Sequence, residues 1–295
     1  MQISNIYNHR KDIIITPRRE IKRNITLYKY ISKKALEGLI KYGDFRVTYQ
    51  EDSNDPYDLR PARNISSATN LNKKKTQGFI SLTGNKNCAP MWGNYAEKHT
   101  GALIEFKIPF FDYQKIDNSS EHERQFLKRT ADLISRGFKI YYFHAFYDEG
   151  RLKYSTNSRY IIKCKYAKDH KRVHTTDICF GNVDPCIVNE NDILNTLCTK
   201  DWDWRYEKEY RIPIRAPRDI NKKHKSTKMQ FTQILTPFIT SVIIGIKNQV
   251  TIKSLREKID YQRAHMANAN YYIPENVKIK KASINSDSFQ PYYGI

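Results

Sequence analysis

The stretch ITLYKYISKKALEGLIKYG, residues 25–43, carries the signals of a strand, a turn and a helix in succession. Its first residues are mainly β-branched or aromatic, which favours a strand. Ser32 is suited to cap a helix, the apolar residues that follow recur with the spacing of one helix face, and Gly43 is suited to end it. We therefore expect a strand over residues 25–30 followed directly by a helix over residues 33–42.

Similar patterns continue along the chain and predict a mixture of strands and helices. We expect further strands over residues 45–50, 78–82, 102–109, 138–146, 159–167, 205–214 and 238–246. We expect further helices over residues 89–99, 121–137, 191–200 and 251–259. Neither an internal repeat nor an interdomain linker interrupts this series. The pattern is typical of a single α+β domain with mostly antiparallel sheets and flanking helices.

The ends of the chain and one internal segment lack this periodicity. Residues 1–24 alternate short apolar runs with basic clusters and are expected to form a basic N-terminal arm. The domain itself is expected over residues 25–268, and residues 269–295 are expected to form a C-terminal tail with one possible strand. Residues 60–77 are polar and aperiodic, which predicts a loop or a mobile flap.

The charge of the chain points to its partners rather than to its fold. Lysine and arginine number 51 against 31 acidic residues, which gives a formal net charge of +20. Such a charge attracts polyanions, so we expect DNA, RNA or an acidic protein as partner. The alternative is that an AT-rich genome enriched lysine along with isoleucine, asparagine and tyrosine. The sequence does not determine the oligomeric state.

The cysteines and histidines give no pattern of a metal site. The five cysteines are odd in number and form no CxxC pair, which is typical of reduced thiols in the cytoplasm. His170 and His174 have HxxxH spacing but lie in a lysine-rich stretch that is more typical of a loop. No apolar run approaches the ~18 residues of a membrane span, and the N-terminus lacks the apolar region of a signal peptide. We therefore expect a cytoplasmic protein without a membrane partner or a bound metal.

Two carboxylates in the segment EKEYRI are candidates for chemistry. Glu207 and Glu209 are two residues apart in an expected strand, so their side chains should lie on one face. Together they could favour positive charge that develops in a cleft. The alternative is an exposed strand face on which the glutamates pair with cations such as Arg211.

Five segments together resemble domain-of-unknown-function family 2971, which occurs in bacteria and their phages. In chain order they are LYKYIS (residues 27–32), NDPYD (54–58), MWGNYAEKHTGALIEF (91–106), WRYEKEYRI (204–212) and ITSVIIGI (239–246). The likeness spans roughly residues 26–260. This family has no established activity.

A more distant similarity, to the ADP-ribosyltransferase superfamily, implies a chemistry. The order of a strand and helix, a Ser/Thr strand end and an ExE strand is similar to that superfamily. The similarity implies that Glu209 holds the nicotinamide ribose of NAD and favours the cationic transition state. It implies that Glu207 deprotonates or positions the acceptor.

The same similarity implies an NAD-binding role for residues on two other strands. In FISLT, Ser81 would orient the catalytic glutamate and Thr83 would lie at the strand edge that holds nicotinamide, although Leu82 replaces the superfamily's middle threonine. The first strand has Tyr28, Lys29 and Tyr30 where the superfamily has an arginine or histidine. Tyr30 could stack on nicotinamide. Lys29 could bind the diphosphate as a point charge, but without the bidentate hydrogen bonds that an arginine forms.

Residues 27–43 are also similar to the opening of DarT-like enzymes, which ADP-ribosylate DNA. We therefore expect an NAD-dependent ADP-ribosyltransferase that modifies a macromolecule, with nucleic acid favoured over protein. A toxin or effector in the conflict between phages and bacteria would suit this activity. An NAD glycohydrolase, in which water is the acceptor, remains an alternative.

Two alternatives lie outside NAD chemistry. A magnesium-dependent nuclease could use Asp55 with Glu105 and Lys107, because IEFK has the ExK spacing of restriction-like nucleases. A non-enzymatic nucleic-acid-binding protein could use its basic surface and its 21 tyrosines for phosphate contacts and base stacking.

Overall fold

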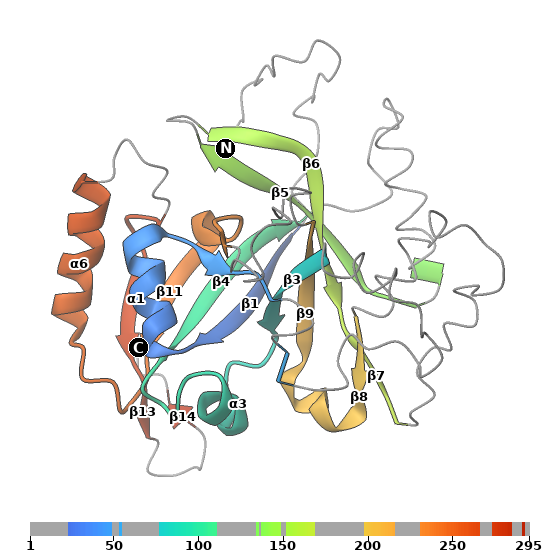
Figure 1. Ribbon diagram of the computed structural model, residues 1–295, viewed down its shortest axis with the longest axis horizontal. Coiled ribbons are helices and arrows are strands. Elements are labelled where there is room, and N and C mark those ends of the chain that lie inside the picture. Colours follow the sequence, from blue (N-terminus) through green and yellow to red (C-terminus); the bar gives the residue numbers. More distant parts are fainter. Residues whose placement is uncertain are drawn as a thin grey trace, which may run out of the picture.

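An eight-stranded, mostly antiparallel sheet forms the centre of the computed structural model (Figure 1). The structure describes residues 23–48, 53–54, 77–110, 134–135, 137–148, 152–168, 198–215, 231–265, 273–284 and 291–292. The strands, in their order across the sheet, are β12 (Lys278–Lys281), β11 (Ile239–Ile244), β4 (Ala102–Phe110), β1 (Arg23–Ile31), β3 (Gln77–Thr83), β9 (Glu209–Arg215), β6 (Leu152–Lys163) and β5 (Ile140–Asp148). This confirms a mixed α+β body with a large, mostly antiparallel sheet.

Short strand pairs and a few helices surround this sheet. The pairs are β2 (Phe45–Arg46) with β10 (Phe231–Thr232), β7 (Lys165–Ala167) with β8 (Thr199–Asp201), and β13 (Ser283–Ile284) with β14 (Pro291–Tyr292). The helices are α1 (Lys33–Tyr42), α3 (Ala89–Asn94) and α6 (Ile252–His265), with 3₁₀ helices η4 (Trp202–Glu207) and η5 (Thr236–Phe238). No helix in the described ranges is long and apolar enough to cross a membrane.

The strand and helix expected at residues 25–43 are confirmed as β1 and α1. The Ser32 hydroxyl accepts a hydrogen bond from the Ala35 amide at 3.2 Å, and this caps the helix. Gly43 ends it with a φ of 68°, a left-handed conformation that glycine adopts at little cost. The apolar face of α1 packs on the sheet through Leu36 and Leu39.

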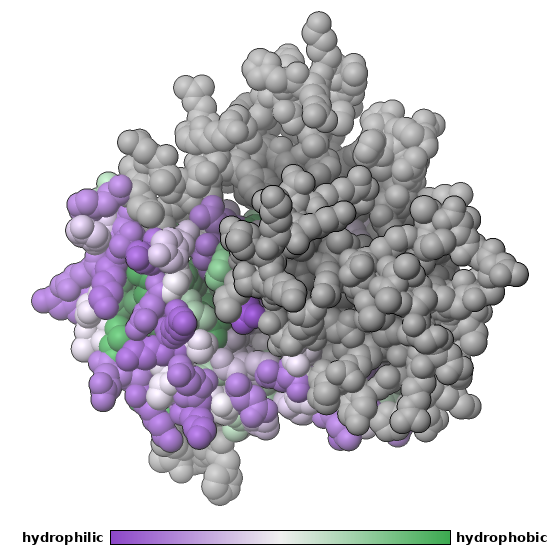
Figure 2. Space-filling model, viewed as in Figure 1, coloured by the Kyte–Doolittle hydropathy of each residue, from purple (hydrophilic) through white to green (hydrophobic). Residues whose placement is uncertain are grey.

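Helices cover the two faces of the central strands differently. Alternation along β1 directs Leu27 toward α1 and α6, and Tyr30 toward α3. On the α3 side, the fully buried ring of Trp92 meets the Tyr30 ring edge-on at 5.2 Å between centroids. The described outer surface over α1 and α6 is mostly hydrophilic (Figure 2), as expected for amphipathic helices on one face of a sheet.

The strand expected at residues 205–214 is wrong in its first part. Residues 202–207 form η4, which begins where the Asp201 carboxylate accepts a hydrogen bond from the Asp203 amide at 2.9 Å. Lys208 then takes a left-handed conformation with φ of 44°, and β9 begins only at Glu209. The argument that the two glutamates share a strand face is therefore wrong, because only Glu209 belongs to the strand.

Other expected elements differ in part or lie outside the described ranges. The helix expected at residues 191–200 is wrong at its end, where Thr199 and Lys200 form part of β8, parallel to β7. Of the strand expected at residues 45–50, Phe45 and Arg46 form β2 and Thr48 forms an isolated bridge with Phe79, while residues 49–50 lie outside the described residues. Most of the helix expected at residues 121–137, the loop at residues 60–77 except Gln77, and residues 1–22 of the arm lie outside the described residues.

The C-terminal segment contributes to the main sheet. β12, within the strand considered possible in the tail, pairs in parallel with β11 through four residue pairs. Ile273 and Val277, just before it, are buried in the main core. The helix expected at residues 89–99 ends at Asn94, because residues 97–99 all have positive φ.

Candidate functional site

The three strands that carry the candidate residues lie side by side in the sheet. Tyr28 of β1 pairs with Thr83 of β3, and Thr83 pairs in turn with Glu209 of β9. β1 pairs with β4 through nine residue pairs but with β3 only through this one. Beyond that pair, the Lys29 ammonium reaches across to the Ser81 carbonyl oxygen at 2.8 Å. The sheet therefore opens between β1 and β3.

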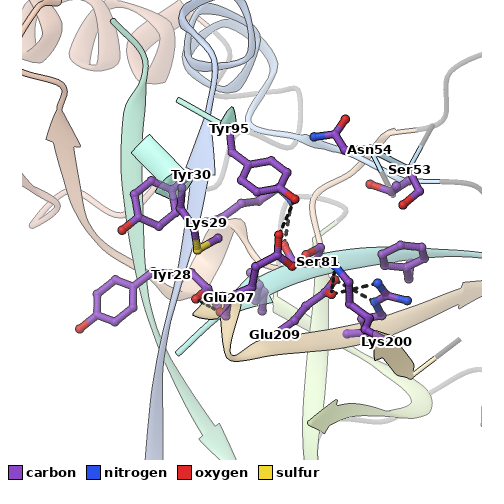
Figure 3. Close-up of a pocket in the computed structure, with 16 residues that line it drawn as sticks. Tyr28, Lys29, Tyr30, Ser53, Asn54, Ser81, Tyr95, Lys200, Glu207 and Glu209 are labelled. Atoms are coloured by element: carbon purple, nitrogen blue, oxygen red, sulfur yellow. Dashed lines mark hydrogen bonds and ion pairs between the residues drawn. The ribbon is translucent and has the colours of Figure 1, made fainter. Parts of the chain in front are cut away.

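A cavity of about 180 Å³ lies at this opening (Figure 3). Its walls come from β1, β3, β8, β9, η4 and the turn after α3. The seven candidate residues of the NAD site all line it: Tyr28, Lys29, Tyr30, Ser81, Thr83, Glu207 and Glu209. The structure thus brings together every residue that the superfamily similarity implied.

Lys200 of β8 links the two glutamates. Its ammonium lies 2.6 Å from the Glu207 carboxylate and 3.0 Å from that of Glu209. The backbone turns at Lys208, and this brings the end of η4 beside the start of β9. All three side chains are at most 4% exposed. The two carboxylates converge because of this turn and the shared cation, and not because of strand alternation.

Glu209 is held as a carboxylate by several donors. The Arg211 guanidinium donates to both of its oxygens, at 2.8 and 2.9 Å, and the Ser81 hydroxyl is also hydrogen-bonded to it. Burial alone would raise the pKa of Glu209, but Arg211 and Lys200 outweigh it and lower the pKa to about 2. The pairing with Arg211 that we considered as an alternative is present, but this part of the strand is buried and not an exposed face.

Glu207 has a different environment. Burial raises its pKa above the ordinary value for glutamate, and the nearby charge of Glu209 adds to this effect. Lys200 and the Tyr95 hydroxyl, which donates to Glu207 Oε1 at 2.5 Å, act in the opposite direction. A carboxylate can accept about four hydrogen bonds. Glu207 thus combines a higher proton affinity than Glu209 with capacity to accept a further donor.

Hydrogen bonds to the backbone of Glu207 and of Glu209 fix the turn that these two residues flank. The Thr83 hydroxyl donates to the Glu207 carbonyl oxygen and accepts from the Asn85 amide at 2.8 Å. The Glu209 amide donates to the Tyr166 hydroxyl at 2.7 Å. Thr83 therefore connects the end of β3 to the residue that carries one of the carboxylates, a role that differs from holding nicotinamide at the strand edge.

The residues of β1 form the opposite wall. Tyr30 is 6% exposed and donates its hydroxyl to the Lys86 carbonyl oxygen at 2.6 Å, while its ring packs on Trp92. The hydroxyls of Tyr28 and Tyr30 point away from the glutamates (Figure 3). This packing favours a structural role for Tyr30 over stacking on a ligand. Burial lowers the pKa of Lys29 to about 8, although Glu209 acts against this.

Sequence reasoning missed two residues of this site. Lys200 fell in an expected helix, and one lysine among 51 basic residues carries no signal of its own. Tyr95 lies in the segment MWGNYAEKH, where its spacing from Trp92 indicated only a helix face. Both reach Glu207 through tertiary packing of β8 and of the turn after α3, which no local pattern predicts.

Of the residues of the nuclease alternative, Glu105 and Lys107 do not line the cavity. Glu105 accepts a hydrogen bond from the Thr240 hydroxyl at 2.9 Å, and Lys107 is exposed. Asp55, His170 and His174 lie outside the described residues. Among the residues that the structure places, no group of three or more His, Cys, Asp or Glu could hold a metal ion.

Comparisons with known proteins support part of the expected relationship. No curated protein and no solved structure matches the chain, so the similarity to ADP-ribosyltransferases receives no support from them. The turn after α3, β8, η4 and the beginning of β9 carry Tyr95, Lys200, Glu207 and Glu209. These elements fall within residues 91–212, which match the family model described as a protein of unknown function, DUF2971.

Proposed function

We propose that the cavity binds NAD and that the protein transfers ADP-ribose from it to a macromolecular acceptor. The observation that carries this proposal is the convergence of seven side chains from β1, β3, β9 and η4 on one cavity. These seven residues belong to three motifs that lie far apart in the chain. Buried charged groups are costly unless they are paired, so a cluster of them beside a cavity favours a functional site.

Glu209 would supply a fixed negative charge. Its pKa of about 2 means that it is ionised at every physiological pH. Positive charge develops on the ribose as the bond to nicotinamide breaks, and a buried carboxylate stabilises such charge more than an exposed one. Because Arg211, Lys200 and Ser81 already occupy its oxygens, this role depends on charge more than on new hydrogen bonds to ribose.

Glu207 would handle the proton of the acceptor. In the reaction, the bond between the anomeric carbon and the nicotinamide nitrogen breaks, and nicotinamide leaves with the electron pair. A nucleophilic oxygen or nitrogen of the acceptor bonds to that carbon, and its proton passes to the Glu207 carboxylate. The raised pKa of Glu207 suits this step, because a general base works best with a pKa near the working pH.

The size of the cavity suits one end of the dinucleotide. Apolar cavities of about 150 Å³ hold a benzene ring, so about 180 Å³ has room for a nicotinamide-sized ring. The rest of NAD would extend toward the rim at Ser53 and Asn54 (Figure 3). Lys29 would offer one positive charge to the diphosphate, with less directional grip than an arginine.

The net charge of +20 favours a polyanionic acceptor, with nucleic acid ahead of protein. The test is incubation of the purified protein with NAD labelled in its adenine moiety. Parallel reactions contain DNA, RNA, cell protein or no acceptor, and nicotinamide release is measured with label transfer. We expect nicotinamide release in all reactions that contain the right acceptor, and label on that acceptor.

Two glutamate variants make the test specific. Glu209→Gln keeps the shape of the side chain but removes its charge, and should lower nicotinamide release at least ~100-fold. Glu105→Gln is the matched control, because Glu105 lies on β4 outside the cavity and should be dispensable. Release without any acceptor would assign NAD hydrolysis. A folded protein that neither binds NAD nor releases nicotinamide would refute the proposal.

A further inference from the structure

We propose that Lys200 positions Glu207 and Glu209 for ADP-ribosyl transfer through one ammonium group shared by both carboxylates. This inference rests on the function proposed above and adds a residue that lies outside the motifs of β1, β3 and β9. It assigns Lys200 no contact with substrate. Its part is to keep both glutamates charged and close together.

The geometry of Lys200 fits this role. Its ammonium is within 3.0 Å of both carboxylates, and the side chain is 4% exposed. Lys200 pairs with Tyr166 in the parallel ladder of β7 and β8, so its backbone is fixed. Its ammonium also lies over the Trp204 ring, 5.0 Å from the centroid, and this contact restricts it further. The cation is thus held in place before any ligand binds.

Two buried carboxylates need such a cation. Like charges this close raise each other's proton affinity, so without compensation one of the two becomes protonated. A positive charge between them allows both to remain ionised in a medium where unpaired charge is costly. Lys200 is therefore suited to keep Glu207 available as a base while Glu209 supplies charge.

The two glutamates depend on Lys200 to different degrees. Glu209 keeps the bidentate Arg211 when Lys200 is removed. Glu207 keeps the Tyr95 hydroxyl, which carries no charge. Loss of Lys200 should therefore raise the pKa of Glu207 far more than that of Glu209.

Several other ionisable groups face Glu207 and must be considered. These are Lys200 of β8, Glu209 of β9, Tyr95 after α3, Tyr206 of η4 and Cys88 before α3. Burial raises the pKa of Tyr95, Tyr206 and Cys88, so these three stay neutral near pH 7. Among these groups, Lys200 and Glu209 are the ones expected to shift the charge of Glu207 in this range.

The test follows the carboxyl groups directly. Glutamate labelled with ¹³C at the carboxyl carbon is titrated by NMR in the wild type, Lys200→Met and Lys200→Arg, without NAD. The Glu207 signal is assigned by its loss in Glu207→Gln. In Lys200→Met we expect the Glu207 titration to move up by at least about one pH unit, a tenfold change in proton affinity. Lys200→Arg should keep it near the wild-type midpoint.

The same variants are compared in NAD turnover. Lys200→Met should lower kcat at pH 7 by up to about tenfold for each pH unit that the Glu207 titration moves, and should regain part of it at higher pH, because Glu207 then ionises. The KM for NAD should change little. A residue needed only for packing would lower activity equally at every pH. An unshifted Glu207 titration in Lys200→Met would overturn the inference.

Folding of the variant is tested separately. If Lys200→Met does not fold, the double variant with Glu207→Gln decides, since it removes one of the two uncompensated charges. If the double variant folds, this supports the proposed shared charge. If neither the single nor the double variant folds, Lys200 is needed for packing, and the inference is overturned. A shifted titration in a protein without NAD turnover would refute the proposed reaction alone. Full turnover with an unshifted titration would refute the role of Lys200 alone.

Discussion

Thr83 at the end of β3 lies directly opposite Glu209 at the start of β9 in the antiparallel ladder. Thr83 is 1% exposed. Its hydroxyl donates a hydrogen bond to the Glu207 carbonyl oxygen and accepts one from the Asn85 amide. The residue therefore connects two strands and the turn that leads away from β3.

Thr83→Val should destabilise the protein by about 1–3 kcal/mol, because it removes the hydrogen-bond partner of the buried Glu207 carbonyl oxygen and of the half-buried Asn85 amide. Urea unfolding measures the difference in free energy of unfolding. Thr83→Ser keeps the hydroxyl and serves as control, with an expected loss below about 1.5 kcal/mol. Equal losses in the two variants would show that the methyl group matters and the hydrogen bonds do not.

The parts of the site that the sequence predicted belong to strands with strong local signals. Tyr28 and Lys29 lie in a β-branched and aromatic run, and Ser81 lies in a similar one. Their motifs also carried a family likeness, so their convergence could be anticipated. Lys200 and Tyr95 could not, because their positions depend on the parallel pairing of β7 with β8 and on the turn after α3.

The kink at Lys208 shows why the path of the chain near the glutamates was mispredicted. A continuous strand was expected through residues 205–214, yet Asp201 caps a 3₁₀ helix immediately before it. Asp, Ser and Asn are common helix N-cap residues. The N-cap signal of Asp201 is weaker than the strand-like pattern that follows it in the sequence. A left-handed lysine has no sequence signal, since glycine or asparagine is usual there.

Lys208 offers a direct test of this kink. Lys208→Gly should keep the fold and change the free energy of unfolding by less than about 1 kcal/mol, because relief of the left-handed strain offsets the greater freedom of the unfolded chain. Lys208→Val should lose at least about 1 kcal/mol, since a β-branched residue at a φ of 44° is strained. Thermal unfolding compares the stability of the two variants, and activity measurements compare their function. A valine variant as stable as the glycine variant would show that the fold does not require a left-handed conformation at residue 208.

Acid should weaken the fold through Glu209. Its pKa is about 2 in the folded protein, against an ordinary value of 4.5. A carboxyl group whose pKa is lowered on folding stabilises the protein above its unfolded pKa, and this contribution is lost as pH falls from about 4.5 toward 2. The full contribution is on the order of 3 kcal/mol.

Urea unfolding of wild type and Glu209→Gln at several pH values measures this contribution. The wild type should be more stable at pH 6, and the difference should shrink steadily below about pH 4.5. Glu207 has a raised pKa and opposes this trend, and it does so less in Glu209→Gln, because the charge of Glu209 is one cause of the raised pKa. A difference that stays constant down to pH 3 would mean that Glu209 is not stabilised as a carboxylate.

Lys29 makes binding of an anionic ligand depend on pH. Burial lowers its pKa to about 8, so the ammonium is mostly charged at pH 7 and mostly neutral at pH 9. If the diphosphate of NAD needs this charge, the Kd should rise about tenfold for each pH unit above 8. Lys29→Met should bind NAD weakly at all pH values and lose this dependence. Lys107→Met is the matched control, because Lys107 is exposed on β4 outside the cavity.

Calorimetry in two buffers of different ionisation enthalpy would detect the same charge independently. Near pH 8 the wild type should take up protons on binding, since a bound phosphate raises the pKa of the Lys29 ammonium. Lys29→Met should take up none at that pH, whereas Lys107→Met should behave as the wild type. A Kd that is independent of pH from 7 to 9, with no proton uptake, would place the anion away from Lys29.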